Sequence, residues 1–142
     1  MVSFYSELTT LPGPKSIEIA TDWLGKIINQ NNKLLVRLSY VFCTDNYLLE
    51  LNKKHLNHDT FTDVITFDNS EESTQVDADI FISLDRIKEN AQTYDTSYQQ
   101  ELHRVMVHGL LHLLGQNDKT PVDKELMTQR ENEALGLLNC FT

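Results

Sequence analysis

The segment VMVHGLLHLL, residues 105–114, restricts the possible folds of this chain more than any other feature. Every position in it is apolar or glycine except for two histidines, which lie four residues apart. A helix that is apolar around most of its circumference has to be covered by other elements, so we expect this one to be packed inside the molecule. An imidazole buried there without a partner would cost about 1–3 kcal/mol. The segment therefore predicts a buried helix and raises the question of what His108 and His112 bind.

Alternation of apolar and polar residues predicts several strands. The segment LLVRLSYVFC alternates and is rich in β-branched and aromatic residues, which is typical of a strand with one buried face. On that face we expect Val36, Leu38, Tyr40 and Phe42. Two later segments are separated by an acidic, polar stretch and are expected to pair as an antiparallel hairpin. The predicted strands are residues 3–6, 34–43, 63–68 and 78–85.

Helical spacing of apolar residues and local capping signals predict the helices. Ser16 is a plausible N-cap for the first, and Thr44 or Asp45 for the second. In the last helix Thr120 is expected to cap, Pro121 suits the first helical position, and Asp123 lies where a capping-box acid would be. The predicted helices are residues 17–29, 44–56, 85–95, the segment from Glu101 to Gly115, and 120–136.

Strands and helices are mixed but do not alternate strictly, which predicts an α+β fold: a small mixed, partly antiparallel sheet covered by helices. No repeat, low-complexity tract or linker interrupts the chain, so residues 1–142 are expected to form a single domain. Trp23, Tyr40 and Phe42 are expected in its core. Cys43 and Cys140 are too few and too far apart to indicate a disulfide framework, and Cys43 is expected to be buried.

The formal net charge of −9 disfavours indiscriminate binding to nucleic acid, which depends on cations that displace counterions from phosphates. One local cluster of basic groups is nevertheless present in LNKKHLNH, and it contains Lys53, Lys54, His55 and His58. No apolar run approaches the length of a membrane span, and the first residues do not resemble a secretory signal. We therefore expect a cytoplasmic protein without a membrane partner.

The spacing of His108, His112, Gly115 and Asp118 predicts a metal site. In a helix, residues four apart lie on the same face, so both imidazoles can be directed at one point. Gly115 can adopt the left-handed conformation that ends a helix and turns the chain back, which would bring Asp118 toward the histidines. Zinc suits three such ligands with one position left for water. The alternative is that both histidines are ordinary helix residues and that Gly115 only ends the helix.

The residue after the first histidine helps to identify the chemistry. Zinc peptidases carry a glutamate there as general base, and this chain has Gly109. A zinc ion with three protein ligands still acidifies bound water and polarises a phosphoryl or carbonyl oxygen. Hydrolysis is therefore the expected reaction class, with the general base unassigned, while peptide hydrolysis by the zinc-peptidase mechanism is disfavoured.

Four blocks of the sequence resemble the YbeY family of bacterial rRNA maturation factors, also described as endoribonucleases. The family pattern H-G-x-L-H-L-x-G-x-D-H is similar to residues 108–118, and its T-D/N-V-L-S-F segment is similar to residues 62–67. The strand ADIFIS resembles the family's "GDI" strand, and MTQRENE resembles its closing "M-R-x-x-E" helix. These blocks occur in the family's order at compatible spacing between Leu48 and Glu133.

The resemblance implies an α+β fold with one zinc ion at the mouth of a cleft, and an endoribonuclease that matures the 3′ end of small-subunit (16S) rRNA. It also implies a metal-bound water as nucleophile and rRNA and ribosomal components as partners. His108 and His112 match the first two metal ligands of the family. The chain departs from the pattern at Asp118, where the family usually has histidine, and at Leu56, where it usually has an arginine that faces the cleft. Leucine cannot grip a phosphate as arginine does.

Further residues are candidates for the cleft or for contact with substrate: His55, His58, Thr62, Asp63 and Asp79. Asp79 is alternatively a group that orients a ligand histidine, which metal sites commonly need. His103 is expected to be a surface residue, and Arg130 and Glu131 are most simply explained as exposed charges. Besides the zinc-dependent endoribonuclease, two alternatives remain: a non-catalytic metal-binding ribosome-assembly factor, and a metallopeptidase. The oligomeric state is left open.

Overall fold

A computed structural model describes residues 1–7, 9–56 and 61–142, and its centre is a mixed sheet with the strand order β1-β2-β4-β3. β1, β2 and β4 run parallel, and β3 pairs with β4 in the antiparallel direction. The expected hairpin between the last two strands is therefore confirmed. The strands are β1 (Val2–Ser6), β2 (Leu34–Cys43), β3 (Val64–Asp68) and β4 (Gln75–Ser83).

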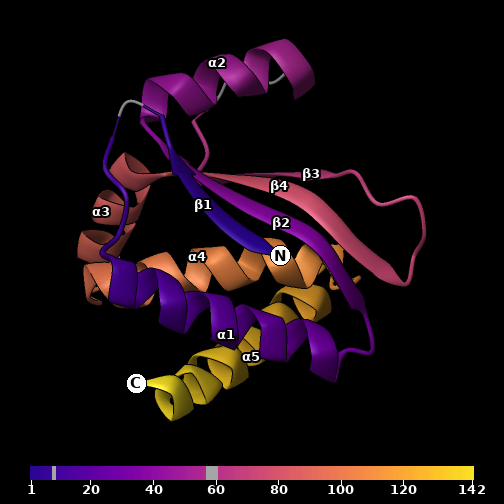
Figure 1. The fold of residues 1–142 in the computed structure, drawn as a ribbon. Coiled ribbons are helices and arrows are strands. Elements are labelled where there is room, and N and C mark those ends of the chain that lie inside the picture. The colour runs from indigo at the N-terminus through magenta and orange to yellow at the C-terminus, as the bar shows by residue number, and fades with distance from the viewer. Residues whose placement is uncertain (8, 57–60) are drawn as a thin grey trace.

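The helices cover both faces of this sheet, as Figure 1 shows, with α1, α4 and α5 on one face and α2 on the other. α3 lies at one end of the sheet, directly after β4 (Figure 1). The predicted α+β class is confirmed. The helices are α1 (Pro14–Gln30), α2 (Asp45–Leu56), α3 (Leu84–Thr93), α4 (Tyr98–Leu113) and α5 (Pro121–Leu138), followed by a short 3₁₀ turn at Asn139–Phe141. Within the described ranges, no helix has the length and apolar character needed to cross a membrane.

The element boundaries differ from the sequence-based expectation at several ends. α1 begins at Pro14 with Gly13 as N-cap, so Ser16 is not its cap, because the fixed φ of proline suits the first turn. α4 begins at Tyr98, where the Ser97 side chain accepts a hydrogen bond from the Gln100 amide. β4 begins at Gln75 rather than 78. The Thr120 cap of α5 is confirmed, since its hydroxyl accepts from the Asp123 amide.

One residue of β2 lies on the unexpected face. The register between β2 and β4 shifts between Leu35 and Arg37, which indicates a bulge at Val36. The alternation is thereby interrupted, and Val36 is 43% exposed instead of sharing the buried face with Leu38, Tyr40 and Phe42. The expectation for Val36 was therefore wrong, whereas Cys43 is buried as predicted.

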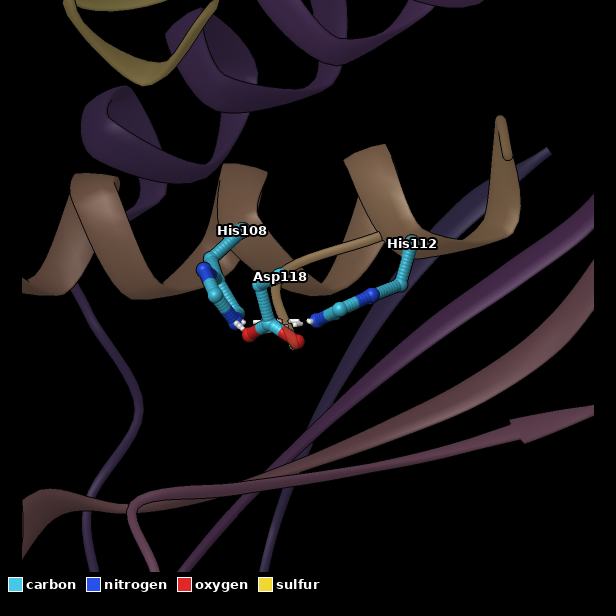
Figure 2. Close-up of side chains that lie close together, drawn as sticks. All are labelled: His108, His112 and Asp118. Atoms are coloured by element: carbon cyan, nitrogen blue, oxygen red, sulfur yellow. Dashed lines mark hydrogen bonds and ion pairs between the residues drawn. The ribbon is translucent and has the colours of Figure 1, made fainter. Parts of the chain in front are cut away.

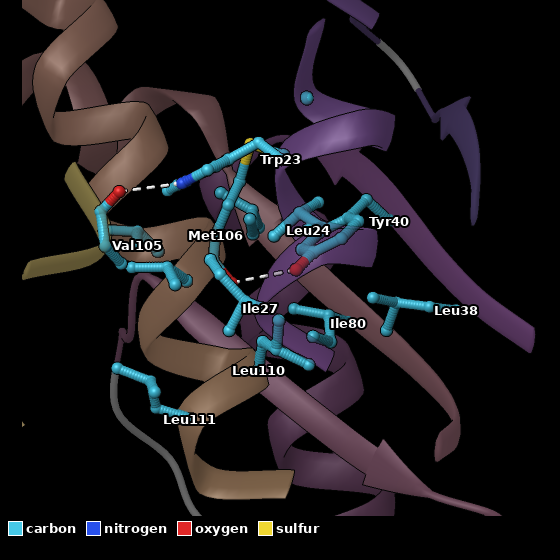
Figure 3. Close-up of a cluster of buried hydrophobic side chains, with 14 of the residues drawn as sticks. Trp23, Leu24, Ile27, Leu38, Tyr40, Ile80, Val105, Met106, Leu110 and Leu111 are labelled. Carbon is cyan, nitrogen blue, oxygen red and sulfur yellow. Dashed lines mark hydrogen bonds between the residues drawn. The ribbon is translucent and has the colours of Figure 1, made fainter. Parts of the chain in front are cut away.

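The main core lies between the sheet and the helices α1, α4 and α5, and Figure 3 shows part of it. Trp23, Tyr40 and Phe42 are fully buried, as expected. Two hydrogen bonds from buried rings fix the helices: Trp23 Nε1 donates to the Ala134 carbonyl at 2.8 Å, and the Tyr40 hydroxyl donates to the Met106 carbonyl at 2.9 Å. The second bond ties α4, the helix of the two histidines, directly to β2, one of the two central strands.

Candidate metal centre

His108 and His112 lie one turn apart on the same face of α4 and point to the same side, as Figure 2 shows. The rest of this helix is apolar where it contacts the core, because Val105, Met106 and Leu110 pack there. The two imidazoles are only partly buried. The apolar faces of α4 thus fix the rotation of the helix, and that rotation sets the direction of both histidines.

A glycine turn brings the chain back toward the histidine pair. Gly115 has a φ of +98°, the conformation expected for it from sequence. The Gly115 amide donates to the His112 carbonyl at 3.1 Å and the Gln116 amide to the Leu111 carbonyl at 3.0 Å, which together form a Schellman motif. The loop after this turn carries Asp118 to the open side of the two rings (Figure 2).

Three potential ligand atoms converge at this point. The Nε2 atoms of His108 and His112 are 3.1 Å apart. Asp118 Oδ2 lies 3.4 Å from the first and 3.3 Å from the second. The three side chains form a group that could hold a metal ion.

The spacing and chemistry of these atoms suit a tetrahedral ion. Ligand distances of about 2.0–2.2 Å in tetrahedral geometry separate neighbouring ligand atoms by roughly 3.3–3.6 Å. The observed separations of 3.1–3.4 Å are close to that range. Two imidazole nitrogens that face each other need either a proton or a metal ion between them, and an adjacent carboxylate stabilises either positive charge.

A buried carboxylate on a neighbouring helix contacts the first histidine. Glu131 of α5 is 7% exposed, and its Oε2 accepts a hydrogen bond of 2.6 Å from His108 Nδ1. Arg104 of α4 donates to Glu131 Oε1 at 2.9 Å. The expectation that Glu131 is an exposed charge was therefore wrong. A signal was available in the sequence, since Glu131 lies in the buried stripe of α5 with Met127, Ala134 and Leu138.

The charges around His108 act on its pKa in opposite directions. Burial lowers the pKa, whereas the hydrogen bond and charge of Glu131, together with the charges of Asp118 and Asp63, raise it. The pKa of His108 in the metal-free protein is raised as a result. The electrostatic potential at the centre is therefore negative and favours a positive charge, whether that charge is a proton or a metal ion.

Arg130 was also expected to be an exposed charge, and it is instead half-buried. Its guanidinium donates to Asn31 Oδ1 at 3.0 Å and to Gln116 Oε1 at 3.4 Å. It thereby joins α5 to the end of α1 and to the loop that leads to Asp118. The expectation was wrong because the surface of α5 at this position is covered by both segments.

Asp79 does not orient a ligand histidine. Its carboxylate accepts hydrogen bonds from Arg37 at 2.7 Å and from Asn69 at 3.1 Å. The neighbouring Ile80 faces Gly109 of α4, so Asp79 points to the opposite face of the sheet. Glu131 occupies the orienting position that the sequence suggested for Asp79.

Asp63 is a predicted cleft residue whose charge acts on the proposed ligand His108. Burial raises the pKa of its carboxyl group, although the charge of His108 and hydrogen bonds from the Asp63 and Val64 amides and from Asn90 oppose this shift. Asn90 Nδ2 lies 3.3 Å from Asp63 Oδ2. A carboxyl group with a raised pKa near a metal site has the properties of a proton-transfer group.

Of the other candidates, His55 belongs to α2, and Thr62 precedes β3. His55 is exposed and its ring packs edge-on against Phe67, with 5.8 Å between centroids. The Thr62 hydroxyl donates to the Val64 carbonyl at 3.4 Å. His58 lies outside the described residues. Leu56, the last residue of α2, is 45% exposed. A role of these residues in a cleft stays a prediction.

Comparison with known proteins gives the family. The sequence model of the family described as "Endoribonuclease YbeY" matches residues 7–139. A protein named "Endoribonuclease YbeY" from Cytophaga hutchinsonii is 46% identical over 136 residues, which cover 96% of this chain and 94% of that protein. A protein of the same name from Amoebophilus asiaticus is 48% identical over 122 residues, which cover 86% of this chain and 81% of that protein.

A solved structure gives the same fold. The solution structure of TM1509 from Thermotoga maritima superposes with a TM-score of 0.70 at 24% sequence identity, and it covers 97% of this chain and 89% of that one. The resemblance noted in the four sequence blocks thus extends over nearly the whole chain. On these matches, the chain belongs to the YbeY family.

Proposed function

We propose that this protein is a zinc-dependent endoribonuclease that acts in the maturation of the 3′ end of small-subunit (16S) rRNA. The observation that carries the proposal is the convergence of His108, His112 and Asp118, whose ligand atoms lie 3.1–3.4 Å apart, in a member of the YbeY family. The names of the relatives support RNA cleavage. The proposed substrate class and ribosomal partners follow from the family resemblance.

The choice of zinc rests on the ligand set. Two imidazole nitrogens and one carboxylate oxygen are ligands that zinc accepts in catalytic sites, where a fourth position stays open. When bound, the ion would polarise a phosphoryl oxygen and acidify a water molecule for attack on phosphorus. Asp118 adds a negative charge that the histidine usual in the family would not, so the bound water should be less acidic than in a three-histidine site.

The residues around the centre have separate roles in this proposal. His108 and His112 hold the ion from one face of α4, and Asp118 closes the site from the loop. Asp63, whose pKa is raised by burial, can accept or release a proton, but the general base stays unassigned. His55, His58 and Thr62 are retained as proposed contacts of the cleft, whereas Asp79, whose carboxylate binds Arg37 and Asn69, is not. The proposal treats residues 1–142 as one domain, acting in the cytoplasm, where bacterial rRNA is processed.

A specific observation favours a second candidate function. Leu56, at the position of the family's usual arginine, ends α2 with an exposed apolar side chain that offers no hydrogen bond to phosphate. Together with the net charge of −9, this suits a metal-binding ribosome-assembly factor that does not cut RNA. In that case the zinc ion would be structural.

One experiment separates these functions. Protein purified without chelator is analysed for metal and then incubated with a small-subunit rRNA precursor, beside the variants His112→Ala and His103→Gln. His103 is the matched control because it lies on the same helix outside the three-ligand group. The proposed nuclease requires about one zinc ion per chain, cleavage by wild-type protein and the control, and loss of cleavage in a folded His112→Ala.

Two outcomes overturn the leading proposal. Stoichiometric metal without cleavage in any of the three proteins leaves the assembly factor. The absence of any transition metal from wild-type protein, even after incubation with zinc, removes the metal centre itself.

A further inference from the structure

One face of α4 carries three polar side chains at intervals of four residues: Arg104, His108 and His112. Glu131 of α5 inserts between the first two and contacts both. The arrangement forms a continuous line from a guanidinium through a carboxylate to the imidazole that faces the metal centre. It joins two helices at the point where the first proposed ligand is held.

The two oxygens of Glu131 have different partners. Oε1 accepts from Arg104 at 2.9 Å, and Oε2 accepts from His108 Nδ1 at 2.6 Å. A carboxylate with both oxygens bound cannot rotate freely, so the plane of the His108 ring is fixed with it. The second guanidinium nitrogen of Arg104 donates to Asn132 Oδ1 at 2.7 Å, which in turn fixes Arg104.

The burial of Glu131 and its pairing with Arg104 determine which nitrogen of His108 carries the proton. A buried carboxylate stays ionised only where a positive group and hydrogen bonds compensate for the loss of water. Arg104 provides the charge. An ionised Glu131 can only accept a hydrogen bond, so His108 Nδ1 must carry the proton in the neutral ring. The lone pair of His108 is then on Nε2, the atom that faces His112 and Asp118.

We infer that Glu131 is a positioning residue, which selects the metal-binding tautomer and orientation of His108, and that Arg104 holds Glu131 in place for this role. This inference rests on the proposed metal centre and deepens it, because it names residues outside the ligand set that determine metal affinity. Carboxylates that accept from a ligand histidine typically change metal affinity by about 10–100-fold when they are removed.

A merely structural role for Glu131 makes a different prediction. If it only joined α4 to α5, its removal would lower stability but leave the tautomer of His108 in the folded protein unchanged. A readout of the tautomer in metal-free protein therefore separates the two roles. Glutamine offers a further distinction, since its amide oxygen can accept from Nδ1 without the charge of the carboxylate.

The test uses the full chain and its variants Glu131→Ala, Glu131→Gln and Arg104→Gln. Glu133→Gln is the matched control, because it removes the same charge from an exposed position of the same helix. Nitrogen NMR of the histidine rings in metal-free protein, at a pH where they are neutral, reports the tautomer. Competition with a chromophoric chelator reports zinc affinity.

The inference predicts the Nδ1-protonated tautomer of His108 in wild-type protein and in Glu133→Gln. In Glu131→Ala we expect a shift toward the Nε2-protonated form and a loss of zinc affinity of about 10–100-fold. Glu131→Gln should restore the tautomer and most of the affinity, and Arg104→Gln should lose affinity by less than Glu131→Ala.

The inference is overturned if Glu131→Ala is folded and retains both the tautomer and the zinc affinity of the wild type. If Glu131→Ala does not fold, Glu131→Gln decides: the Nε2-protonated form of His108 in that folded variant also overturns it. Failure of the proposed function would look different. Wild-type protein would then bind no zinc, while the NMR spectra of metal-free protein would still report whether Glu131 sets the tautomer.

Discussion

Gly109 of α4 lies so close to Thr66 of β3 that a Cβ atom at position 109 would be 3.2 Å from the Thr66 Oγ1. The same Cβ would be 3.2 Å from two side-chain carbons of Ile80 on β4. Gly109 is the residue directly after the first histidine, where zinc peptidases carry their catalytic glutamate. The sheet occupies the space that such a side chain would need. The structure thus gives a physical reason, beyond the residue type, why peptide hydrolysis by that mechanism is disfavoured.

This contact predicts opposite effects of the same substitution at two helical glycines. Gly136 of α5 is exposed and has open space around its Cα, so Gly136→Ala should raise the free energy of unfolding by about 0.5–1 kcal/mol through helix propensity. In Gly109→Ala the gain is offset by a packing cost of about 1–3 kcal/mol, because Ile80 is fully buried and has little room to move. Urea denaturation of both variants checks this. Equal stabilisation by the two alanines would contradict the proposed close approach.

The hydrogen bond from Tyr40 to α4 predicts a stability effect that leaves the metal centre intact. Tyr40→Phe removes a buried donor to the Met106 carbonyl and keeps the shape of the ring. The free energy of unfolding should fall by about 0.5–1.5 kcal/mol. Zinc affinity should stay within about twofold of the wild type, since Met106 lies outside the ligand set. Chemical denaturation and chelator competition measure the two quantities, and a large loss of zinc affinity would show that the tie also positions the histidines.

The sequence predicted those parts of the centre that depend on local geometry. The i, i+4 spacing of the histidines, the left-handed turn at Gly115 and the return of the chain at Asp118 are all set within eleven consecutive residues, 108–118. Helix periodicity and the conformational freedom of glycine suffice to derive them. Most of the strands are likewise predicted by the alternation of apolar and polar residues, and most of the helices by the helical spacing of apolar residues.

The sequence could not give relationships that depend on packing between distant segments. Glu131 is 23 residues from His108, and only the packing of α5 against α4 brings them together. The direction of Asp79 depends on which face of β4 meets α4, and a single bulge in β2 reverses the expected exposure of Val36. Each of these features is set by tertiary structure, which periodicity along one segment does not encode.

His103 predicts a loss of stability at mildly acidic pH. Burial lowers its pKa, although a hydrogen bond that the ring donates to the Gln99 backbone carbonyl opposes the shift, and the ring packs edge-on against Trp23 with centroids 5.6 Å apart. As the pH falls through about 6.5, the unfolded chain binds a proton at this residue before the folded chain does, so folding is disfavoured. His103→Gln removes this contribution. The free energy of unfolding of the variant, measured relative to that of the wild type by urea denaturation, should therefore rise as the pH is lowered from about 8 to about 5.5. A difference that stays constant over this interval would contradict the prediction.

Leu56 offers a direct gain-of-function test of RNA binding. Because its side chain is 45% exposed at the end of α2, Leu56→Arg should change the free energy of unfolding by less than about 0.5 kcal/mol. If the end of α2 borders the RNA path, as the family's usual arginine implies, the new guanidinium can pair with a phosphate. Affinity for single-stranded RNA should then rise, and its logarithmic dependence on salt should steepen by about 0.7 for one added phosphate contact.

Leu34→Arg is the matched control, since Leu34 is also an exposed leucine, at the start of β2. Filter binding over a range of salt concentrations measures both variants. The same rise in affinity for the two would show only the effect of net charge, and would place the RNA path away from α2.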